Sequence, residues 1–408
     1  MKKRNILLLI ILCIISLSVL TGLLIFAFQL QIKKDSANNQ STQHITVSPS
    51  GANASPAPTV ISPSAVSPTP APGQAGTSAT PSPSPTPAVA LKEPIVLGFA
   101  GDVNLDEDNP PAKKYDSAGK GILGLLSEDL LAQMKAVDIM MLNNEFAYST
   151  RGTKTPDKSY TFRADPGRVN ILKDMGVDIV SLANNHALDY GTDALMDTFD
   201  TLEQAGIEYA GAGENLDRAK VPIYFEAGGR KIAFIAASRV IFAGSWYATD
   251  TSAGMVGTYD PALILESVKE AKENSDFVVI FVHWGIEREN YPVDYQKKLA
   301  KQYIDAGADA VIGCHPHVMQ GIEFYKGKPI AYSLGNFIFT SRTNKSGFLK
   351  LYLDADGNVK LQLLPAVYSD TYTYLLTDQE EKADYYDFIR EISFDVSIDE
   401  DGYITQAE

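Results

Sequence analysis

Cysteine and histidine are scarce in this 408-residue sequence. It has two cysteines, Cys13 and Cys314, and Cys13 lies in an apolar run near the N-terminus. Cys314 is therefore the only cysteine of the globular part, which excludes an intrachain disulfide there and leaves cysteine usage without information on the redox compartment. Of the five histidines, His315 and His317 stand on either side of one proline in the segment GCHPHVMQ. A scarce residue type concentrated in this way marks a candidate site.

Charged residues are absent from a long N-terminal stretch. No Asp, Glu, Lys or Arg occurs from Ser36 to Leu91, a segment rich in Pro, Ser, Thr and Ala. Such a composition cannot bury an apolar core, so we predict a disordered linker over residues 29–91. In polyproline II geometry, at about 3.1 Å per residue, the 56 uncharged residues extend to about 170 Å. We expect this linker to hold the globular part clear of a membrane, either to cross a cell wall or merely for insulation.

A single long apolar run precedes the linker. It covers Ile6 to Phe28, and its 23 residues form a helix of about 34 Å, enough to span a hydrocarbon core of about 30 Å. A cleaved secretory signal peptide is the alternative, but its apolar region would be only about 7 to 15 residues long and would end in a small-residue cleavage site. Here the run continues into FAFQLQIKKD without such a site. We therefore predict a transmembrane signal anchor at residues 6–28.

The charges beside this run predict the orientation of the protein. Three basic residues precede the run and two follow it, a small excess that favours a cytoplasmic N-terminus of residues 1–5. The globular domain, residues 92–408, is then extracellular. We therefore expect a single-pass protein of the cell membrane.

Positive charge is scarce in the globular part. The chain has a net charge of −15, and the segment through Asp35 carries five basic residues and one acidic residue, so the remainder has a net charge of −19. A domain this acidic is a poor partner for nucleic acid or anionic lipid, and we expect no nucleic acid partner. An anionic polymer would need metal ions or a local basic patch to bind here.

Residues 92–408 have the pattern of one mixed α/β domain. Short apolar runs alternate with helical patterns, as in βα units, and two hairpins follow Gly321. The predicted helices cover Leu123–Lys135, Pro166–Met175, Thr192–Ala205, Pro261–Glu273 and Asp294–Ala306. The predicted strands are PIVLGFAG, VDIMMLNN, VDIVSLANN, KIAFIAAS, DFVVIFVHW and ADAVIGCH.

Polar side chains follow these predicted strands. In open α/β sheets, ligands bind at the carboxyl ends of the strands, so residues at those ends are candidates for a site. They are Asp102, Asn104, Asn143, Asn144, Glu145, Asn184, Asn185, His186, Asp189, His283, Glu287, His315 and His317. Taken singly, an Asn or Asp there is usually a turn former and a histidine is usually structural. Together they include every histidine outside the linker, and that combination favours a functional site.

The residue types in this set suit two divalent ions. Ions held about 3.5 to 4 Å apart need a bridging carboxylate and terminal imidazole, amide or carboxylate ligands. The predicted metal ligands are Asp102, Glu145, Asn185, His283, His315 and His317. Mixed oxygen and nitrogen donors suit Mn, Fe or Zn better than Ca. A turned backbone around the proline would let each of its two flanking imidazoles address a different ion, and we expect Cys314 to point away from the site.

Five motifs of the chain resemble the CapA family of capsule or poly-γ-glutamate synthesis proteins. They are, in order, GDVN, NNEFAYS, SLANNHALDYG, VHWGIE and GCHPHVMQGIEFYKGKPIAYSLGNFIF. That family is related to the calcineurin-like metallophosphoesterases. The resemblance covers roughly Pro94 to Phe339, and its last block is long and specific. It implies a four-layer α/β/β/α sandwich of metallophosphoesterase type, with two metal ions at the strand ends.

The resemblance also assigns roles to individual residues. It implies that Asp102 is the aspartate of the first phosphoesterase motif, D-x-H, in which Asn104 replaces the histidine. It implies that Glu145 bridges both ions, and that Asn185 and His186 are an amide ligand and the catalytic histidine. The later histidine ligands of the family match His283, His315 and His317.

The leading functional hypothesis is a membrane-anchored, extracellular component of capsule or poly-γ-glutamate synthesis or export, within a membrane polymer-synthesis complex. A metal-dependent hydrolase of extracellular phosphoesters or polymer ends is one alternative, and a non-catalytic, metal-stabilised accessory module is another. In a hydrolase, two ions would activate water, and His186 would protonate the leaving group or stabilise the developing charge. Asn104, Glu287 and Arg288 are candidate contacts to an anionic polymer or phosphoester, although Glu287 and Arg288 fit a solvated surface equally well.

Overall fold

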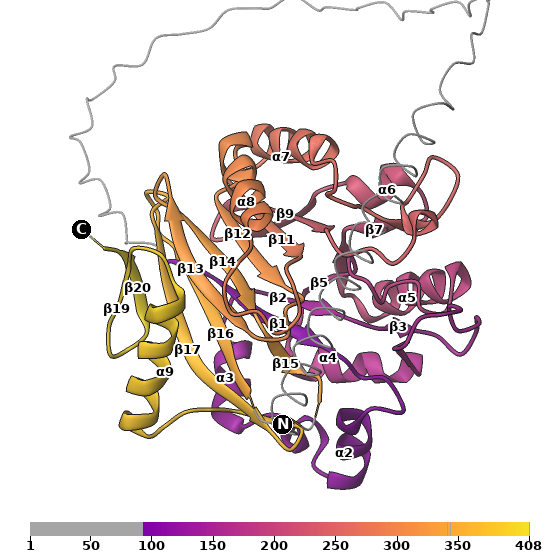
Figure 1. The fold of residues 1–408 in the computed structure, drawn as a ribbon, viewed down its shortest axis with the longest axis horizontal. Helices are drawn as coiled ribbons and strands as arrows, with labels where there is room; N and C mark the ends of the chain where they lie inside the picture. The colour runs from indigo at the N-terminus through magenta and orange to yellow at the C-terminus, as the bar shows by residue number, and fades with distance from the viewer. Residues whose placement is uncertain (1–92, 341, 343, 408) are drawn as a thin grey trace, which may run out of the picture. The chain divides into compact units, whose positions relative to one another are not determined.

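The computed structural model of the chain describes residues 93–340, 342 and 344–407 (Figure 1). The predicted signal anchor at residues 6–28 and the predicted linker at residues 29–91 lie outside the described residues. Among the helices that are described, none combines the length and the apolar character needed to cross a membrane. The described residues include two large β-sheets and helices on both sides of them, which confirms the predicted mixed α/β class.

The larger sheet has ten strands and two kinds of pairing. Its parallel part consists of β1 (Ile95–Val103), β2 (Ile139–Asn144), β5 (Ile179–Ser181) and β6 (Glu208–Ala210). Its antiparallel part continues from β1 through β16 (Asn344–Leu353), β17 (Val359–Ser369), β20 (Tyr403–Gln406) and β19 (Val396–Ile398). Two short strands lie off this path: β15 (Asn336–Ile338) pairs with β1, and β18 (Tyr372–Leu375) pairs with β17.

The second sheet has six strands. In spatial order they are β13 (Met319–Tyr325), β14 (Lys328–Leu334), β12 (Ala310–Cys314), β11 (Phe277–His283), β9 (Arg230–Ser238) and β8 (Ile223–Ala227). The four inner strands are parallel, and the two outer strands are antiparallel to their neighbours. Both predicted hairpins are confirmed, as β13 with β14 here and as β16 with β17 in the larger sheet.

Helices cover the outer face of each sheet. Side chains of α3 (Glu128–Lys135), α4 (Val169–Met175) and α5 (Thr192–Ala205) share an apolar core with the larger sheet. Side chains of α7 (Ala262–Asn274) and α8 (Asp294–Ala306) share one with the second sheet. The layers therefore run helices, sheet, sheet, helices.

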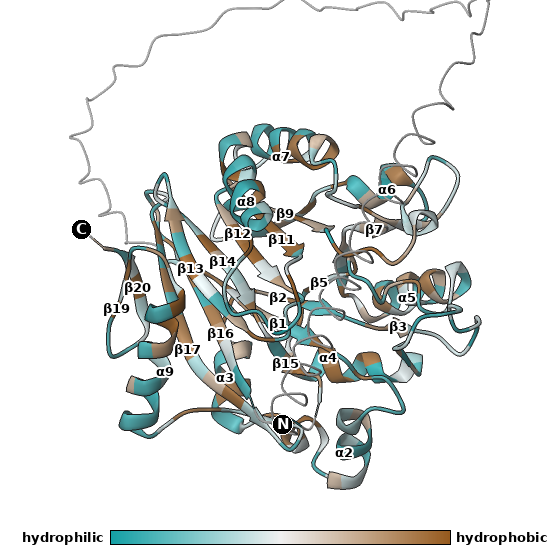
Figure 2. Cartoon of the chain, viewed as in Figure 1, coloured by the Kyte–Doolittle hydropathy of each residue, from teal (hydrophilic) through white to brown (hydrophobic). Residues whose placement is uncertain are grey.

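A third core lies between the two sheets, and strand alternation separates it from the outer cores. In β11 the odd-numbered residues from Phe277 to Phe281 face the other sheet, whereas the even-numbered residues from Val278 to Val282 pack with α7 and α8. Because both faces of a central strand are buried, these strands are continuous apolar runs. Figure 2 shows this as brown residues along the strands and mixed teal and brown on α7 and α8.

The predicted helices differ in accuracy. Thr192–Ala205 and Asp294–Ala306 are confirmed without a shift as α5 and α8, and Pro261–Glu273 is confirmed with a shift of one residue as α7. The helix predicted at Leu123–Lys135 is divided into a 3-10 turn at Gly121–Gly124 and α3, because Leu126 leaves the helix to pair with Thr373. The helix predicted at Pro166–Met175 is likewise divided into a 3-10 turn at Pro166–Arg168 and α4.

The sequence patterns did not predict several short elements and one longer helix. The short ones are α2 (Pro110–Ala118), α6 (Leu216–Lys220), the 3-10 turn at Gly244–Trp246, β3 (Ala147–Tyr148), β4 (Arg163–Ala164), β7 (Ala212–Gly213), β10 (Gly254–Met255) and the strands β6, β8, β15, β18, β19 and β20. The longer one is α9 (Gln379–Ile392), which follows the hairpins and places Tyr385, Ile389 and Ile392 in the core between the sheets.

Candidate metal centre

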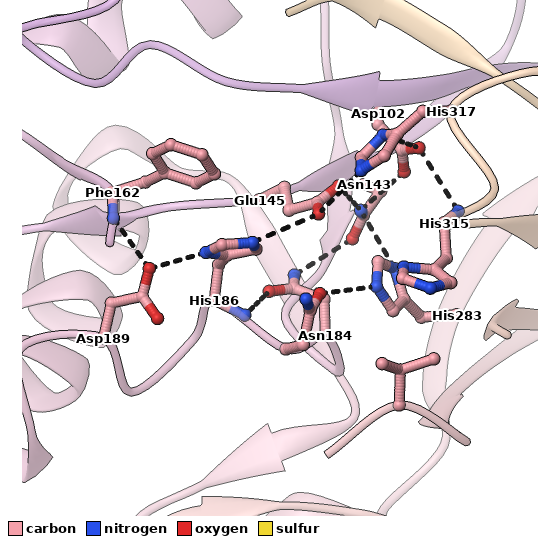
Figure 3. Close-up of polar contacts among 12 residues, drawn as sticks. Asp102, Asn143, Glu145, Phe162, Asn184, His186, Asp189, His283, His315 and His317 are labelled. Carbon is pink, nitrogen blue, oxygen red and sulfur yellow. Dashed lines mark hydrogen bonds and ion pairs between the residues drawn. The ribbon is translucent and has the colours of Figure 1, made fainter. Parts of the chain in front are cut away.

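The six side chains predicted to bind metal come from both sheets. Three of them lie at or after the ends of β1, β2 and β5 of the larger sheet, and the others lie at the end of β11 and in the turn between β12 and β13 of the second sheet. They are Asp102, Glu145, Asn185, His283, His315 and His317. Figure 3 shows the two carboxylates and the three labelled imidazoles of this set gathered at one place. The structure therefore brings the set together, and the roles of its members as ligands stay a prediction.

Asn143 holds the two carboxylates of the cluster. Its side-chain Nδ2 donates to Asp102 Oδ1 at 2.8 Å and to Glu145 Oε2 at 3.1 Å. The other carboxylate oxygen of Asp102, Oδ2, accepts the backbone N–H of His315 at 3.2 Å. Glu145 Oε1 is buried and has no hydrogen-bond partner among the described residues. The sequence marked Asn143 only as a polar residue at a strand end, because nothing in its spacing distinguishes it from a turn former.

One group of side chains around Glu145 offers several atoms that could bind a metal ion. Ligand atoms of Glu145, His283 and His315 lie within 4.8 Å of one another, and His283 Nε2 lies 2.8 Å from the side-chain oxygen of Asn185. Within the described part of the chain, His315 Nδ1 is buried without a hydrogen-bond partner, as Glu145 Oε1 is. A divalent ion bound in this group would satisfy such buried, unpaired atoms where they face it. We call Glu145, Asn185, His283 and His315 the four-donor group.

A second group shares Glu145 with the first. Ligand atoms of Asp102, Glu145 and His317 lie within 4.8 Å of one another, and His317 Nε2 lies 3.9 Å from Glu145 Oε1. His317 Nδ1 also contacts Asn336 Oδ1 at 2.8 Å. Asn104 stands where the D-x-H motif has its histidine. Its side chain is buried, and its oxygen accepts the N–H of Asp106 at 2.9 Å. This group therefore offers three metal-binding side chains. Glu145 belongs to both groups, so it is placed to bridge an ion in one group and an ion in the other.

The backbone of the HPH segment is turned. His315 and His317 have φ angles of 99° and 59°, in the left-handed region that non-glycine residues rarely occupy. Their ring centroids are 5.8 Å apart, and each imidazole belongs to a different donor group. The structure therefore has the turned backbone that was expected to let the two rings address different ions. Such strain is typical of functional sites, where surrounding structure holds it in place.

Cys314 lies against the cluster, so the prediction that it points away is wrong. Its Sγ lies 3.4 Å from His283 Nδ1, and Sγ, His283 and Asp102 offer atoms within 4.8 Å of one another. The prediction assumed an extended chain through His315, but the positive φ of that residue breaks the alternation of side chains. Burial holds the pKa of the Cys314 thiol well above its ordinary value.

His186 is oriented by a buried carboxylate. Its Nδ1 lies 2.6 Å from Asp189 Oδ2, which also accepts the N–H of Phe162 at 2.7 Å, and its Nε2 faces Glu145 Oε1 at 3.8 Å (Figure 3). Lys158, with only 7% of its side chain exposed, forms an ion pair with Asp189 and lies 2.9 Å from His186 Nδ1. Burial lowers the pKa of His186 despite the neighbouring Asp189. Sequence reasoning missed Lys158, because it lies in an irregular loop with no motif around it.

Burial dominates the electrostatics of the cluster. It lowers the pKa of His283 well below its ordinary value and that of His315 to about 3, and neighbouring histidines add to both shifts. Burial also raises the pKa of Glu145 well above its ordinary value, and the charge of Asp102 adds to that shift. Burial alone would raise the pKa of Asp102 and lower that of His317. Their mutual hydrogen bond and attraction outweigh burial, so the pKa of Asp102 is lowered and that of His317 is raised. Neutral imidazoles and ionised carboxylates are the forms that bind metal, so a bound cation would lower the pKa of Glu145.

A pocket of about 520 Å³ opens beside the cluster. His186 and His317 form part of its wall, and so do Glu287 and Arg288, two of the residues predicted to contact substrate. Arg288 has a φ of 66°, and its backbone N–H donates to the carbonyl of Pro316 at 2.8 Å, which ties its loop to the HPH turn. The third predicted contact, Asn104, is buried outside the pocket wall. The role of all three as substrate contacts stays a prediction.

The remainder of the pocket wall combines aromatic rings with a second arginine. Phe162 lies with its ring centroid 4.2 Å from that of His186, and Phe339 lies 4.6 Å from His317. Tyr160 and Arg342 also line the pocket, and 72% of Tyr160 is exposed. Sequence reasoning did not assign these residues to the site. Phe339 ends the last of the five motifs but received no role there, and Tyr160, Phe162 and Arg342 lie in loops outside the motifs.

Comparison with known proteins places this geometry in context. The family model described as "Bacterial capsule synthesis protein PGA_cap" matches residues 96–341. The PGA biosynthesis protein CapA of Bacillus subtilis (strain 168) is 37% identical over 216 residues, which cover 52% of this chain and 56% of that protein. The capsule biosynthesis protein CapA of Bacillus anthracis is 36% identical over 216 residues, covering 51% and 52%. The chain thus spans about half the length of these curated relatives.

Among solved structures, the sulfate thiohydrolase SoxB of Thermus thermophilus in complex with glycerol matches with a TM-score of 0.40 and 14% sequence identity. The match covers 66% of this chain and 56% of the SoxB chain. A likeness at this level carries no argument about function.

Proposed function

Because the chain belongs to the family of bacterial capsule synthesis proteins PGA_cap, we propose that it is a membrane-anchored, extracellular component of capsule or poly-γ-glutamate synthesis or export. We propose further that its domain binds divalent metal ions beside a pocket for an anionic polymer or phosphoester. The predicted signal anchor at residues 6–28 and the linker at 29–91 support an outward-facing domain. The names of two relatives, a PGA biosynthesis protein and a capsule biosynthesis protein, support the process.

The observation that carries the proposal is a pair of buried atoms in the four-donor group that could bind metal and that lack a hydrogen-bond partner within the ranges that the structure describes. Glu145 Oε1 and His315 Nδ1 have no hydrogen-bond partner among the described residues, and each costs about 1–3 kcal/mol when left unsatisfied. An ion bound there with Asn185 and His283 removes that cost. We expect the three-donor group of Asp102, Glu145 and His317 to hold a second ion more weakly, since Asn104 supplies no ligand.

The donor set suits Mn, Fe or Zn. When bound, such ions polarise a substrate oxygen and lower the pKa of a coordinated water. The residues of the chain do the remaining work. Glu145 joins the two donor groups, and Asp189 fixes Nδ1 of His186 so that Nε2 faces the cluster. From that position a protonated His186 can give its Nε2 hydrogen to a leaving group at the pocket wall, while Nδ1 keeps the hydrogen that it shares with Asp189.

The pocket resolves the conflict between an acidic domain and an anionic ligand. The domain carries a net charge of −19, yet Arg288 and Arg342 both line the pocket beside His317. Guanidinium groups form paired hydrogen bonds to carboxylates and phosphates. Together with bound cations they supply local positive charge that the domain as a whole lacks, and this supports binding of an anionic chain at the pocket, beside the acidic Glu287.

The test uses the purified full-length chain in detergent, with metal analysis, and binding and turnover assays on phosphoesters and γ-glutamyl peptides. Metal bound at the domain and metal-dependent binding of poly-γ-glutamate would support the proposal. Turnover that is lost in His186→Ala would select the alternative of a hydrolase, which the orientation of His186 by Asp189 favours. A protein that binds neither metal nor polymer would refute the proposed function. Protease accessibility of the domain on intact cells tests the extracellular location.

A further inference from the structure

Cys314 faces the metal centre from within the second sheet. It is fully buried, and it pairs in register with His283 on the neighbouring parallel strand. Both side chains lie on the face that is turned toward the other sheet, and Cys314 Sγ is 3.4 Å from His283 Nδ1. Because sheet register fixes this contact, it is a rigid feature of the fold.

The two ring nitrogens of His283 have different neighbours. Nε2 lies 2.8 Å from the side-chain oxygen of Asn185, within the four-donor group. Nδ1 faces Cys314 Sγ and the Nδ2 of Asn143, each at 3.4 Å. The orientation of Asn143 is settled, because its Oδ1 accepts a hydrogen bond from Asn184 at 3.0 Å. Nδ2 of Asn143 is therefore a donor, and of these two neighbours of Nδ1 only the sulfur can accept.

A histidine that binds metal through one ring nitrogen carries its hydrogen on the other and donates it to a partner that fixes the ring. We propose that Cys314 is this partner: when an ion takes the place of the hydrogen that Nε2 shares with the Asn185 oxygen, His283 carries its hydrogen on Nδ1, and the sulfur of Cys314 accepts it and so presents Nε2 to an ion held by the four-donor group. The S–H group keeps an acceptor of its own, the carbonyl of Val282 at 3.8 Å. The inference rests on the metal centre of the proposed function and adds a positioning residue to it.

Direct ligation by Cys314 is the competing arrangement. Its Sγ, His283 and Asp102 offer atoms within 4.8 Å of one another. The Nδ2 of Asn143, however, lies 2.8 Å from Asp102 Oδ1 and 3.4 Å from His283 Nδ1. This amide group fills the space that an ion bound to Nδ1 and Asp102 would need. The geometry therefore favours Cys314 as a hydrogen-bond partner over Cys314 as a ligand.

The test measures Zn and Co affinity of the full-length chain in detergent by competition with a chromophoric chelator. All proteins carry Cys13→Ser, so that Cys314 is the only thiol. Cys314→Val removes the acceptor at similar size, and we expect affinity to fall about 10- to 100-fold. Cys314→Ser keeps an acceptor and is expected to lie closer to the parent protein. Ile312→Val, a buried change on the same face of the same strand, is the matched control and leaves affinity unchanged.

The outcomes separate the inference from the proposed function. Equal affinity of the parent protein and Cys314→Val overturns the inference alone, whereas a parent protein that binds no ion overturns both. A sulfur-to-cobalt charge-transfer band that Cys314→Ser abolishes makes Cys314 a ligand and also overturns the inference. Melting in chelator confirms that each variant is folded, and Cys314→Ala provides the same comparison if the valine variant does not fold.

Discussion

Glu145→Gln is the substitution that most clearly separates stability from metal binding. Glu145 is fully buried beside Asp102, and its Oε1 has no partner among the described residues, whereas Oε2 accepts from Asn143 at 3.1 Å. A glutamine oxygen can keep that hydrogen bond, its amide group replaces the unpaired oxygen, and the substitution removes the buried charge beside Asp102. A buried group left unsatisfied costs about 1–3 kcal/mol, and more when it is charged, so in chelator we expect Glu145→Gln to be more stable than the parent protein by about that amount.

Metal offsets most or all of this benefit, because the parent protein gains more stability from binding than the variant does. At a metal concentration of about 100 times Kd, binding adds about 2.7 kcal/mol to the stability of the parent protein. If the substitution weakens binding about 100-fold, the same concentration adds only about 0.4 kcal/mol to the variant. For a domain of this size about 1 kcal/mol corresponds to a change in Tm of about 2 °C, which calorimetry in chelator and in metal resolves.

The pH dependence in chelator provides a further check. The folded-state pKa of Glu145 is raised above its ordinary value of 4.5, so folding favours the protonated acid. The stability of the parent protein is then complete below that value and falls as pH rises toward the raised pKa, whereas Glu145→Gln lacks this loss. The advantage of the variant should therefore grow with pH. Glu391→Gln, a change of an exposed acid on α9 outside the pocket wall, is the control and should change neither measurement. A Glu145→Gln protein that melts lower in chelator, with its response to metal intact, would refute the reasoning.

Three other predictions address the remaining parts of the site. If the protein is a hydrolase, His186→Ala should lower turnover by about 10²- to 10⁴-fold with metal content unchanged by elemental analysis, and loss of metal would instead make His186 a ligand. Arg288→Ala should weaken poly-γ-glutamate binding about tenfold, as loss of a hydrogen bond to a charged group predicts, and should leave the affinity for a neutral polymer unchanged. Calorimetry that finds equal poly-γ-glutamate affinity in the variant and the parent protein would remove Arg288 from the binding site. Gly313→Ala should destabilise the fold by about 1–3 kcal/mol in denaturant titrations, because its Cβ would lie 2.0 Å from the carbonyl oxygen of Tyr332, and an unchanged midpoint would show that β12 moves freely.

The sequence predicted the convergence of the cluster better than its internal geometry. Ligand positions followed from one rule, that functional polar residues stand at the carboxyl ends of strands, and the structure brings the strand ends of two sheets together, so that Asp102 and Glu145 meet the three histidines. The direction of Cys314 was wrong, because it depended on the φ of His315, and no sequence pattern reports a single left-handed residue. Lys158 was missed because only the folded chain brings its loop to Asp189.

The fold, like the site, was predicted where local sequence pattern decides it and missed where distant contacts do. Amphipathic helices such as α5 and α8 were predicted to the residue, because their spacing of apolar side chains is set by the core they cover. The helix expected at Leu123–Lys135 was divided because Leu126 pairs with Thr373, a residue far away in the sequence. Tertiary contacts of this kind override local propensity, and a periodic pattern does not contain them.

Anomalous diffraction from crystals of the protein grown with Mn or Zn tests the central claim most directly. The account predicts a peak enclosed by Glu145, Asn185, His283 and His315, at about 2.0–2.2 Å from their ligand atoms, with a weaker peak toward Asp102 and His317. Full loading of the protein with metal and no peak among these residues would contradict it.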